Sequence, residues 1–371
     1  MKNLFTVLVK RPIGSFLRWL EEERYKHNLA RQELVVPDKG VYLSYAGQSV
    51  PSSNGVIHGG RVKLVHLAQV YPEKKLLTNI IYLVSSAVPQ HAETLVRYLK
   101  GKGVKLVWNQ NGVAYPAWDK GDYKTTNSRL ASLLRMADYV VYQSEFCRLS
   151  ADRYLGVARV PSKVLYNPVD TEKFSPSSNP PPVEIWQLLV TGTHLQPDRV
   201  LLILKTLSEL IKRGQNAKLM IAGRLSWPDG DQETEEAIIR LKLKGHVELL
   251  GAYTQDQAPE IYQSAHILFH IKYKDPCPTV PIEAMSCSVP VIGSLSGGMS
   301  ELVSDQGGIL LEVPDVWDEM CYPPPGEMVD AVISIMADLD DWRHKARQRA
   351  VNHFSKEYWL EQHRQVFTEV L

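Results

Sequence analysis

The chain has 371 residues, more than one hydrophobic core usually supports, so we expect two domains. Its 42 basic residues nearly balance its 41 acidic residues, and a net charge of +1 provides no global field to attract nucleic acid. Four irregularly spaced cysteines without a CxxC pair argue against a disulfide framework, zinc site or redox motif. A reducing cytoplasmic setting therefore fits best.

Residues 1–39 form an N-terminal extension that we predict to be helical over "SFLRWLEEERYKHNLARQ". Trp19 and Leu20 follow the basic pair Lys10 and Arg11, a pattern that suits peripheral contact with the inner face of a membrane. The acids at Glu21–Glu23 favour the alternative, a helix docked on the protein itself. The order of basic and apolar residues argues against a secretory signal, and no apolar run is long enough for a spanning helix.

From about Gly40 onward, short β-rich apolar runs alternate with helix-like stretches, the pattern of parallel sheets covered on both faces. The pattern restarts at "IWQLLVTG", after a proline-rich connection at about Tyr166–Pro182. We therefore predict two doubly wound, Rossmann-like α/β domains, at 40–168 and 183–344, facing each other across a cleft. The C-terminal stretch 345–371 is expected to be helical throughout and to complete the first domain. The predicted strands are "VYLSYAG", "NIIYLV", "VKLVWNQN" and "ADYVVYQS", then "IWQLLVTG", "KLMIAG", "VELLGAY", "AHILFHI" and "VPVIGS".

Ligands of open α/β sheets bind at the carboxyl ends of the strands, so the loops there are candidate sites. Gly59 and Gly60 precede a helical pattern and suit a phosphate, although a glycine pair is also an ordinary turn. Asn111 directly follows a strand and can orient a hydroxyl group, but an amide cannot act as a general base. In "VTGTHLQPDRV", Gly192 and Arg199 could meet an anion, whereas the nearby histidine fits a structural role better.

The stretch "DPCPTVPIEAMSCSVPVIGSLSGG" carries the strongest signal. Asp275 lies in a loop, and Glu283 lies in the first turn of a helix that has a proline near its start. Gly297 and Gly298 then open another predicted helix after the next strand. Isolated acids near a helix start are usually solvated surface groups. Two helix starts that follow successive strands favour instead a site for an anion and for hydroxyl groups.

At these residues the chain resembles the retaining GT-B glycosyltransferases known as group 1 or family 4. "DPCPTVPIEAMSCSVPVIGSLSGGMSELV" resembles the donor-binding segment of that family. "VLYNPVDTEKFSP" is similar to its interdomain segment, and "ADYVVYQSEFCRLSADRYLG" to the strand and helix before it. The resemblance extends from about Gly40 to the C-terminus and implies a GT-B fold.

The resemblance also implies roles for individual residues. Asp275 would hold hydroxyl groups of the donor sugar, and it is one methylene shorter than the family's usual glutamate. Glu283 would bind the ribose, and backbone amides near Thr279 and Val280 would meet the sugar and the diphosphate. The segment Leu250–Tyr253 would flank the base. The predicted binding set is completed by Gly59, Gly60, Gly192, Arg224, Gly297 and Gly298.

Three further positions depart from the family pattern. Thr193 and Asp198 stand where an arginine and a lysine are usual. Arg199 is therefore the candidate to supply the positive charge that these two positions lack. Asn111 stands where many members have a histidine, which removes one ionisable group. We therefore assign catalytic roles to Asp275, Arg199 and Asn111.

The implied reaction transfers a glycosyl unit from a nucleoside diphosphate sugar, based on UDP or GDP, to a saccharide or lipid-linked acceptor in cell-surface glycan or glycolipid synthesis. No metal and no other cofactor is expected, because helix N-termini and basic side chains would neutralise the diphosphate. Two alternatives stay open: a catalytically impaired sugar-nucleotide-binding protein and a nucleotide-sugar epimerase of the same fold. A nicotinamide dehydrogenase does not fit, since no GxGxxG follows the early strands.

Overall fold

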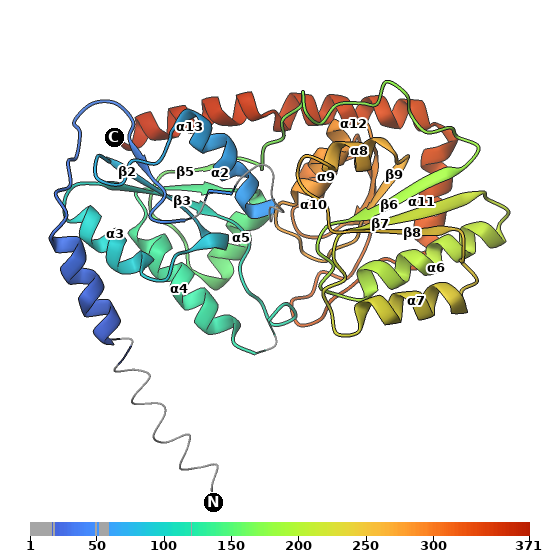
Figure 1. Cartoon of the computed structure of the whole chain (residues 1–371), viewed down its shortest axis with the longest axis horizontal. Coiled ribbons are helices and arrows are strands. Elements are labelled where there is room, and N and C mark those ends of the chain that lie inside the picture. Colours follow the sequence, from blue (N-terminus) through green and yellow to red (C-terminus); the bar gives the residue numbers. More distant parts are fainter. Residues whose placement is uncertain (1–16, 18, 49, 52–58, 120) are drawn as a thin grey trace, which may run out of the picture.

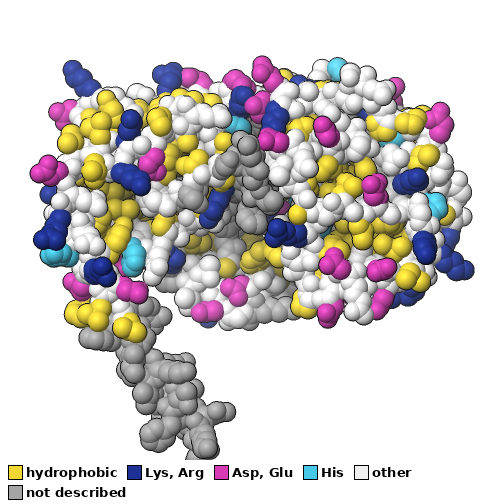
Figure 2. All heavy atoms as spheres, viewed as in Figure 1, with side chains coloured by type: hydrophobic (Ala, Val, Ile, Leu, Met, Phe, Trp, Pro, Cys, Tyr) yellow, Lys and Arg dark blue, Asp and Glu magenta, His cyan; other side chains and the backbone are white. Residues whose placement is uncertain are grey.

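The computed structural model describes residues 17, 19–48, 50–51, 59–119 and 121–371, which form two α/β units side by side (Figure 1). Each unit is a parallel sheet with helices on both faces, which confirms the predicted fold class. On the face in Figure 2, basic and acidic side chains are interspersed rather than gathered into one large patch. Among the described residues, no helix is long and apolar enough to cross a membrane.

The first sheet has the strand order β1-β2-β3-β4-β5, and its strands are parallel. Helix α2 covers one face, and α3, α4 and α5 cover the other, with Trp108 buried among them. A short 3-10 helix at Ser85–Ala87 follows β2. The strands are β1 (Leu43–Ser44), β2 (Ile80–Val84), β3 (Lys105–Gln110), β4 (Tyr139–Tyr142) and β5 (Ser162–Val164), and the helices are α2 (Gly59–Val70), α3 (Ala92–Lys100), α4 (Tyr123–Met136) and α5 (Glu145–Tyr154).

The second sheet has the order β11-β10-β9-β6-β7-β8, so the chain begins in the middle, moves to one edge and returns to build the other half. The order therefore reverses between β6 and β9, which makes this pair the switch point of the sheet. The strands are β6 (Trp186–Thr191), β7 (Ala217–Ala222), β8 (Val247–Gly251), β9 (Ile267–His270), β10 (Val291–Ser294) and β11 (Gly308–Leu311). The helices are α6 (Asp198–Lys212), α7 (Gly230–Arg240), α8 (Ala258–Gln263), α9 (Thr279–Ser286), α10 (Met299–Val303) and α11 (Pro325–Ala337).

All the predicted apolar runs contain strands, whereas β5 and β11 were not predicted. The reason for β5 is its composition, since Ser162 and Lys163 give it no apolar signal and it lies at the sheet edge. Strand β11 is only four residues long and follows a helix so closely that the apolar residues merge into one pattern.

The C-terminal stretch is two helices, α12 (Leu339–Phe354) and α13 (Lys356–Val370), and not one continuous helix as predicted. Ser355 is extended and forms a bridge with Val169 of the interdomain segment, which interrupts the helix. Helix α12 packs on α9 of the second unit and buries Ala346, Ala350 and Phe354 there, so this part does not complete the first domain. Helix α13 packs on the first sheet, and the two helices together span both units (Figure 1).

Residues 19–30 are helical, as predicted for the N-terminal extension. Lys10 and Arg11, the basic pair of the predicted membrane contact, lie outside the described residues. The helix docks on the first unit, where Tyr25 stacks on His91 with ring centroids 4.5 Å apart. Glu22 also pairs with His91 at 2.7 Å, and Leu29 is buried. Leu17, Trp19 and Leu20 are exposed.

We expect the replacement Phe367→Ala to lower the free energy of unfolding by about 3–5 kcal/mol, because it leaves a cavity between α13 and the first sheet. The Phe367 ring is buried and contacts Tyr71 and Tyr82 edge to face. Urea unfolding measures the loss, and Tyr358→Ala on the same helix is the control because Tyr358 is 52% exposed. Equal losses in the two variants would contradict the packing of α13.

Candidate functional site

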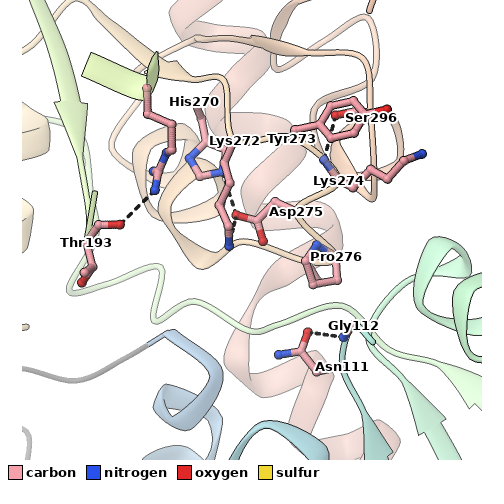
Figure 3. A network of polar contacts seen from close by, with 12 residues as sticks. Asn111, Gly112, Thr193, His270, Lys272, Tyr273, Lys274, Asp275, Pro276 and Ser296 are labelled. Carbon is pink, nitrogen blue, oxygen red and sulfur yellow. Dashed lines mark hydrogen bonds and ion pairs between the residues drawn. The ribbon is translucent and has the colours of Figure 1, made fainter. Parts of the chain in front are cut away.

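The candidate site lies at the switch point of the second sheet. The loop after β6 contains Gly192 and leads into α6, and the loop after β9 contains Asp275 and leads into α9. Because β6 and β9 are neighbours, their carboxyl ends open on the same crevice. The first unit faces this crevice with the loop after β3, where Asn111 and Gly112 lie opposite Pro276 (Figure 3).

Asp275 is buried and carries an ion-pair network (Figure 3). His270 Nε2 lies 3.0 Å and Lys272 Nζ lies 3.1 Å from the same oxygen, Asp275 Oδ2. Burial alone would raise the pKa of the Asp275 carboxyl, but Lys272 and His270 outweigh burial and hold the pKa below its usual range. Burial lowers the pKa of His270, so a neutral imidazole donating its Nε2–H fits the geometry. Asp275 is therefore ionised and fixed in position.

Glu283 is the fifth residue of α9, so it does not lie in the first turn as predicted, and it belongs to a separate network. It accepts hydrogen bonds from Tyr262 Oη at 2.7 Å and from Gln255 Nε2 at 2.9 Å. Burial raises the pKa of Glu283, although these two hydrogen bonds act in the opposite direction. Among the described residues, the hydrogen bonds and ion pairs of Glu283 and of Asp275 share no partner, so the two acids belong to different polar networks.

A small pocket of about 100 Å³ borders Glu283. Its walls come from both units, because helix α2 supplies His66 and Gln69 while the interdomain segment supplies Asp170 and Lys173. Apolar side chains of the pocket include Val62, Val65, Val169 and Phe174. An apolar pocket with a few polar groups is a usual form of small-molecule site, and this one requires both domains.

The first turn of α9 leaves backbone donors available. Its N-cap residue is Pro278, which provides no side-chain cap. Thr279 and Val280, both in the predicted site, are the first two residues of this eight-residue helix. Within the part of the chain that the structure describes, their N–H groups have no acceptor. They are suited to an anionic ligand.

Gly297 and Gly298, both predicted to bind the substrate, lie against the backbone of the Asp275 loop. The N–H of Gly298 donates to the Asp275 carbonyl at 2.9 Å, so it is already used. A Cβ at Gly298 would lie 2.2 Å from the Pro276 carbonyl oxygen, and one at Gly297 would lie 2.5 Å from that of Asp275. The helix that follows, α10, has only five residues.

The remaining predicted residues of the second unit surround β6 and β7. Gly192 has a positive φ of 111° and lies against Gly223, where a Cβ would come within 1.8 Å of the Gly192 carbonyl oxygen. Arg224 is exposed.

Arg199 is only 5% exposed and donates to the Thr193 carbonyl at 2.9 Å, while its Nε is buried without a partner among the described residues. His194 is fully buried, which agrees with a structural role.

In the first unit, Gly59 and Gly60 are the first two residues of α2, and the loop before them at 52–58 lies outside the described residues. Asn111 is partly buried. Its Oδ1 accepts from the N–H of Gly112 at 2.8 Å, and its own N–H donates to Ser85 Oγ at 2.8 Å. Asn111 is therefore held in place at the crevice.

Several contacts join the two units around the Asp275 loop, and the sequence did not predict them. Ser144 Oγ donates to the Pro276 carbonyl at 2.7 Å. The Glu301 carboxylate of the second unit accepts the N–H groups of Glu145 and Phe146 at 2.6 and 2.8 Å, and so caps helix α5 of the first. A charged acceptor at a helix N-terminus stabilises both the helix and the approach of the domains.

Trp317, in the segment between β11 and α11, forms a further contact between the two units. Its ring stacks on Phe146 with centroids 5.7 Å apart and meets Tyr115 and Tyr154 edge-on at 5.3 and 5.2 Å. Lys274 Nζ lies 4.2 Å from the ring centroid, and the Trp317 carbonyl accepts from Ala117 N at 3.0 Å. Only the folded chain brings these residues together, since they are spread over 202 positions from Tyr115 to Trp317.

Helix α2 also contains a buried lysine, Lys63. Its Nζ donates to Asn109 Oδ1 at 3.2 Å, and Asn109 in turn donates to the Tyr82 hydroxyl at 2.9 Å. Burial lowers the pKa of Lys63 to about 7. The folded protein therefore releases this proton at a much lower pH than an unfolded chain does.

Comparison with known proteins agrees with this geometry. The family model described as glycosyl transferases group 1 matches residues 175–349. Crystal structures of Anabaena HepE in complex with UDP, and with UDP and glucose, superpose with TM-scores of 0.68 and 0.69. They cover 91% and 89% of this chain and all of theirs at 17% and 16% identity, so they establish the fold. The chain thus has the GT-B fold, as the motifs predicted, and its residues 175–349 are similar to the group 1 glycosyltransferases.

Curated relatives extend the same comparison. The gpi3 subunit of phosphatidylinositol N-acetylglucosaminyltransferase from Schizosaccharomyces pombe is 23% identical over 224 residues, or 59% of this chain. The Arabidopsis thaliana protein that is named for the same transferase is 25% identical over 48% of the chain. The matched region spans 45% and 38% of those two proteins, less than half of each.

Gly298→Ala should destabilise the protein, because its Cβ would collide with the Pro276 backbone and displace the Asp275 loop. We expect a melting temperature several degrees lower, since loss of roughly 2 kcal/mol or more is typical of such a clash. Gly326→Ala is the matched control, because a Cβ there meets nothing within 4 Å. An unchanged melting temperature for Gly298→Ala would contradict the close packing of this loop.

The wild-type protein should become more stable as pH rises from about 7 to about 9, and Lys63→Met should remove that gain. In this range the unfolded chain keeps the lysine proton while the folded chain releases it, so the unfolded state binds more protons and stability increases with pH. The gain amounts to roughly 2–3 kcal/mol over two pH units. Urea unfolding at both pH values measures it, with the exposed Lys244→Met as control. An identical pH dependence in Lys63→Met and wild type would contradict the buried, deprotonating amine.

Proposed function

We propose that the chain is a glycosyltransferase that moves a sugar from a nucleoside diphosphate sugar to an acceptor hydroxyl with retention at the anomeric carbon. The observation that carries the proposal is the crevice between β6 and β9, where an ionised Asp275 and the open first turn of α9 lie under the opposite domain. A carboxylate that accepts sugar hydroxyls beside amides that donate to phosphate suits such a donor.

In this proposal, Glu283 binds the ribose and its pocket receives the nucleoside. The pocket contains the polar groups of Gln255 and Glu283 beside apolar walls. UDP is favoured over GDP because the similar HepE structures were determined with UDP. Gly59 and Gly60, at the N-terminus of the twelve-residue helix α2, would approach the diphosphate from the first domain.

For the chemical step, we propose front-face substitution. The bond from the anomeric carbon to the diphosphate oxygen breaks, the acceptor oxygen forms a new bond on the same face, and its proton passes to the departing phosphate oxygen. The α9 amides and Arg199 would stabilise the charge that develops on the diphosphate. Asn111 would orient a hydroxyl group by hydrogen bonding, since its amide cannot accept the proton.

A lipid-linked or saccharide acceptor in glycolipid or cell-surface glycan synthesis belongs to the same proposal. The two curated relatives are named for transfer to phosphatidylinositol, which supports a lipid-borne acceptor. The exposed Leu17, Trp19 and Leu20 on the N-terminal helix support peripheral contact with a membrane surface. Their helix is also docked on the protein through His91, so the two contacts would coexist.

Glu283→Ala and Asp275→Ala should separate nucleotide binding from sugar transfer. Glu283→Ala should weaken UDP binding about 10- to 100-fold, the loss expected for hydrogen bonds to a charged group. Asp275→Ala should leave free UDP binding within about threefold and abolish most turnover of the UDP-sugar. Calorimetry with UDP and GDP measures the first effect, and release of the nucleotide with lipid and saccharide acceptors measures the second.

Glu260→Ala is the control because this acid is exposed on the adjacent helix α8. Equal loss of UDP binding in the two variants would contradict the separate roles of the acids. Tight binding of a UDP-sugar without transfer to any acceptor would replace the transferase by a sugar-nucleotide-binding protein. Interconversion of the free sugar nucleotide would favour an epimerase instead.

A further inference from the structure

We propose that Lys272 contacts the donor sugar directly and, together with Asp275, recognises two neighbouring hydroxyl groups on its ring. This inference rests on the proposed function, because it requires a donor sugar at Asp275. Lys272 was not among the residues expected from the sequence. Its assignment comes from the contacts around the Asp275 carboxylate.

The first observation is how this carboxylate is shared. Lys272 Nζ and His270 Nε2 both lie on Oδ2, at 3.1 and 3.0 Å. The other oxygen, Oδ1, has no hydrogen-bond donor among the residues that the structure describes. One carboxylate oxygen is therefore occupied by protein and the other is left to accept from a ligand.

The second observation is the unused donor capacity of the lysine. An ammonium group has three N–H donors and no acceptor. The Lys272 ammonium forms an ion pair with Asp275 at 3.1 Å, and its Nζ lies 5.2 Å from the centroid of the Trp118 ring. The Lys272 side chain is 24% exposed, whereas that of Asp275 is only 9% exposed. The ammonium is thus the more open member of the pair and can donate to a ligand.

The third observation is where Lys272 lies between the domains. Trp118 belongs to the first unit, in the segment after β3 that also contains Asn111, and its ring is 40% exposed. Lys272 follows β9 of the second unit. Its ammonium therefore lies at the boundary of the two domains, over the ring of the partly exposed Trp118.

These features suit Lys272 and Asp275 to bind two neutral hydroxyl groups of the donor sugar. An acceptor-only carboxylate and a donor-only ammonium lie in contact, with Nζ 3.1 Å from Oδ2, so the pair offers one acceptor and one donor side by side. One hydroxyl would donate to Asp275 Oδ1, and its neighbour would accept from Lys272. A sugar carboxylate is disfavoured at this point because Asp275 is ionised and buried beside it.

The test compares Lys272→Met, Lys272→Arg and the exposed control Lys205→Met by calorimetry. The ligands are UDP, a panel of UDP-glucose, UDP-galactose and UDP-N-acetylglucosamine, and 3-deoxy and 4-deoxy forms of the sugar bound most tightly. Lys272→Met should bind UDP within about twofold of wild type but the intact donor about tenfold more weakly. Lys272→Arg should recover part of that loss, because it keeps the charge and the donors.

The deoxy donors distinguish contact from mere positioning of Asp275. For the donor that lacks the contacted hydroxyl, wild type and Lys272→Met should bind equally, since the interaction is already absent. If Lys272→Met lowers the affinity for the intact donor and for both deoxy donors by the same factor, the lysine only positions Asp275 and direct contact is overturned. Unchanged donor affinity in Lys272→Met also overturns the inference while leaving the proposed function intact. Failure of the wild type to bind UDP or any of these donors overturns the proposed function, and the inference with it.

Discussion

The site depends on one backbone contact, the approach of the Gly297–Gly298 turn to the Asp275 loop. The Gly298 N–H donates to the Asp275 carbonyl at 2.9 Å, and no side chain fits between the two segments. Because the two segments follow β9 and β10, the contact joins adjacent loops of the parallel sheet. It fixes the direction in which the Asp275 side chain leaves the backbone. The contacts of Asp275 with His270 and Lys272, and the start of α9 four residues later, all depend on that direction.

The same loop is also the surface on which the first domain rests. Ser144 donates to the Pro276 carbonyl, and Gly112 packs against the Pro276 ring. Glu301 caps α5 across the boundary, and Trp317 lies among aromatic side chains of the first unit. Charged hydrogen bonds to backbone donors and aromatic packing both lose energy steeply with distance, so these contacts favour one relative position of the domains. The interdomain position and the shape of the site are therefore coupled through a few residues of one loop.

Several features could be predicted from the sequence because they are local. Apolar periodicity located the long strands, and the spacing of Asp275, Glu283 and the glycine pair located the donor segment. The predictions failed where packing decides the outcome. The helix break at Ser355 exists because Val169 pairs with it from 186 positions away. The sequence also did not predict that the Gly298 N–H donates to the Asp275 carbonyl, which only folding brings near.

The sequence by itself determined the class of fold, the two-domain order and the residue types gathered near the donor segment, since each follows from patterns within about thirty residues. Tertiary structure alone decided which of these residues interact. Lys272 becomes a site residue because β9 directs it toward Asp275 and the first domain places Trp118 beside it. Arg199 is buried rather than open, and Glu283 lies in a network separate from Asp275. Neighbours distant in sequence decide whether a residue is buried, whether a charge is paired and how many hydrogen bonds a donor or acceptor can still form. No local pattern specifies these properties.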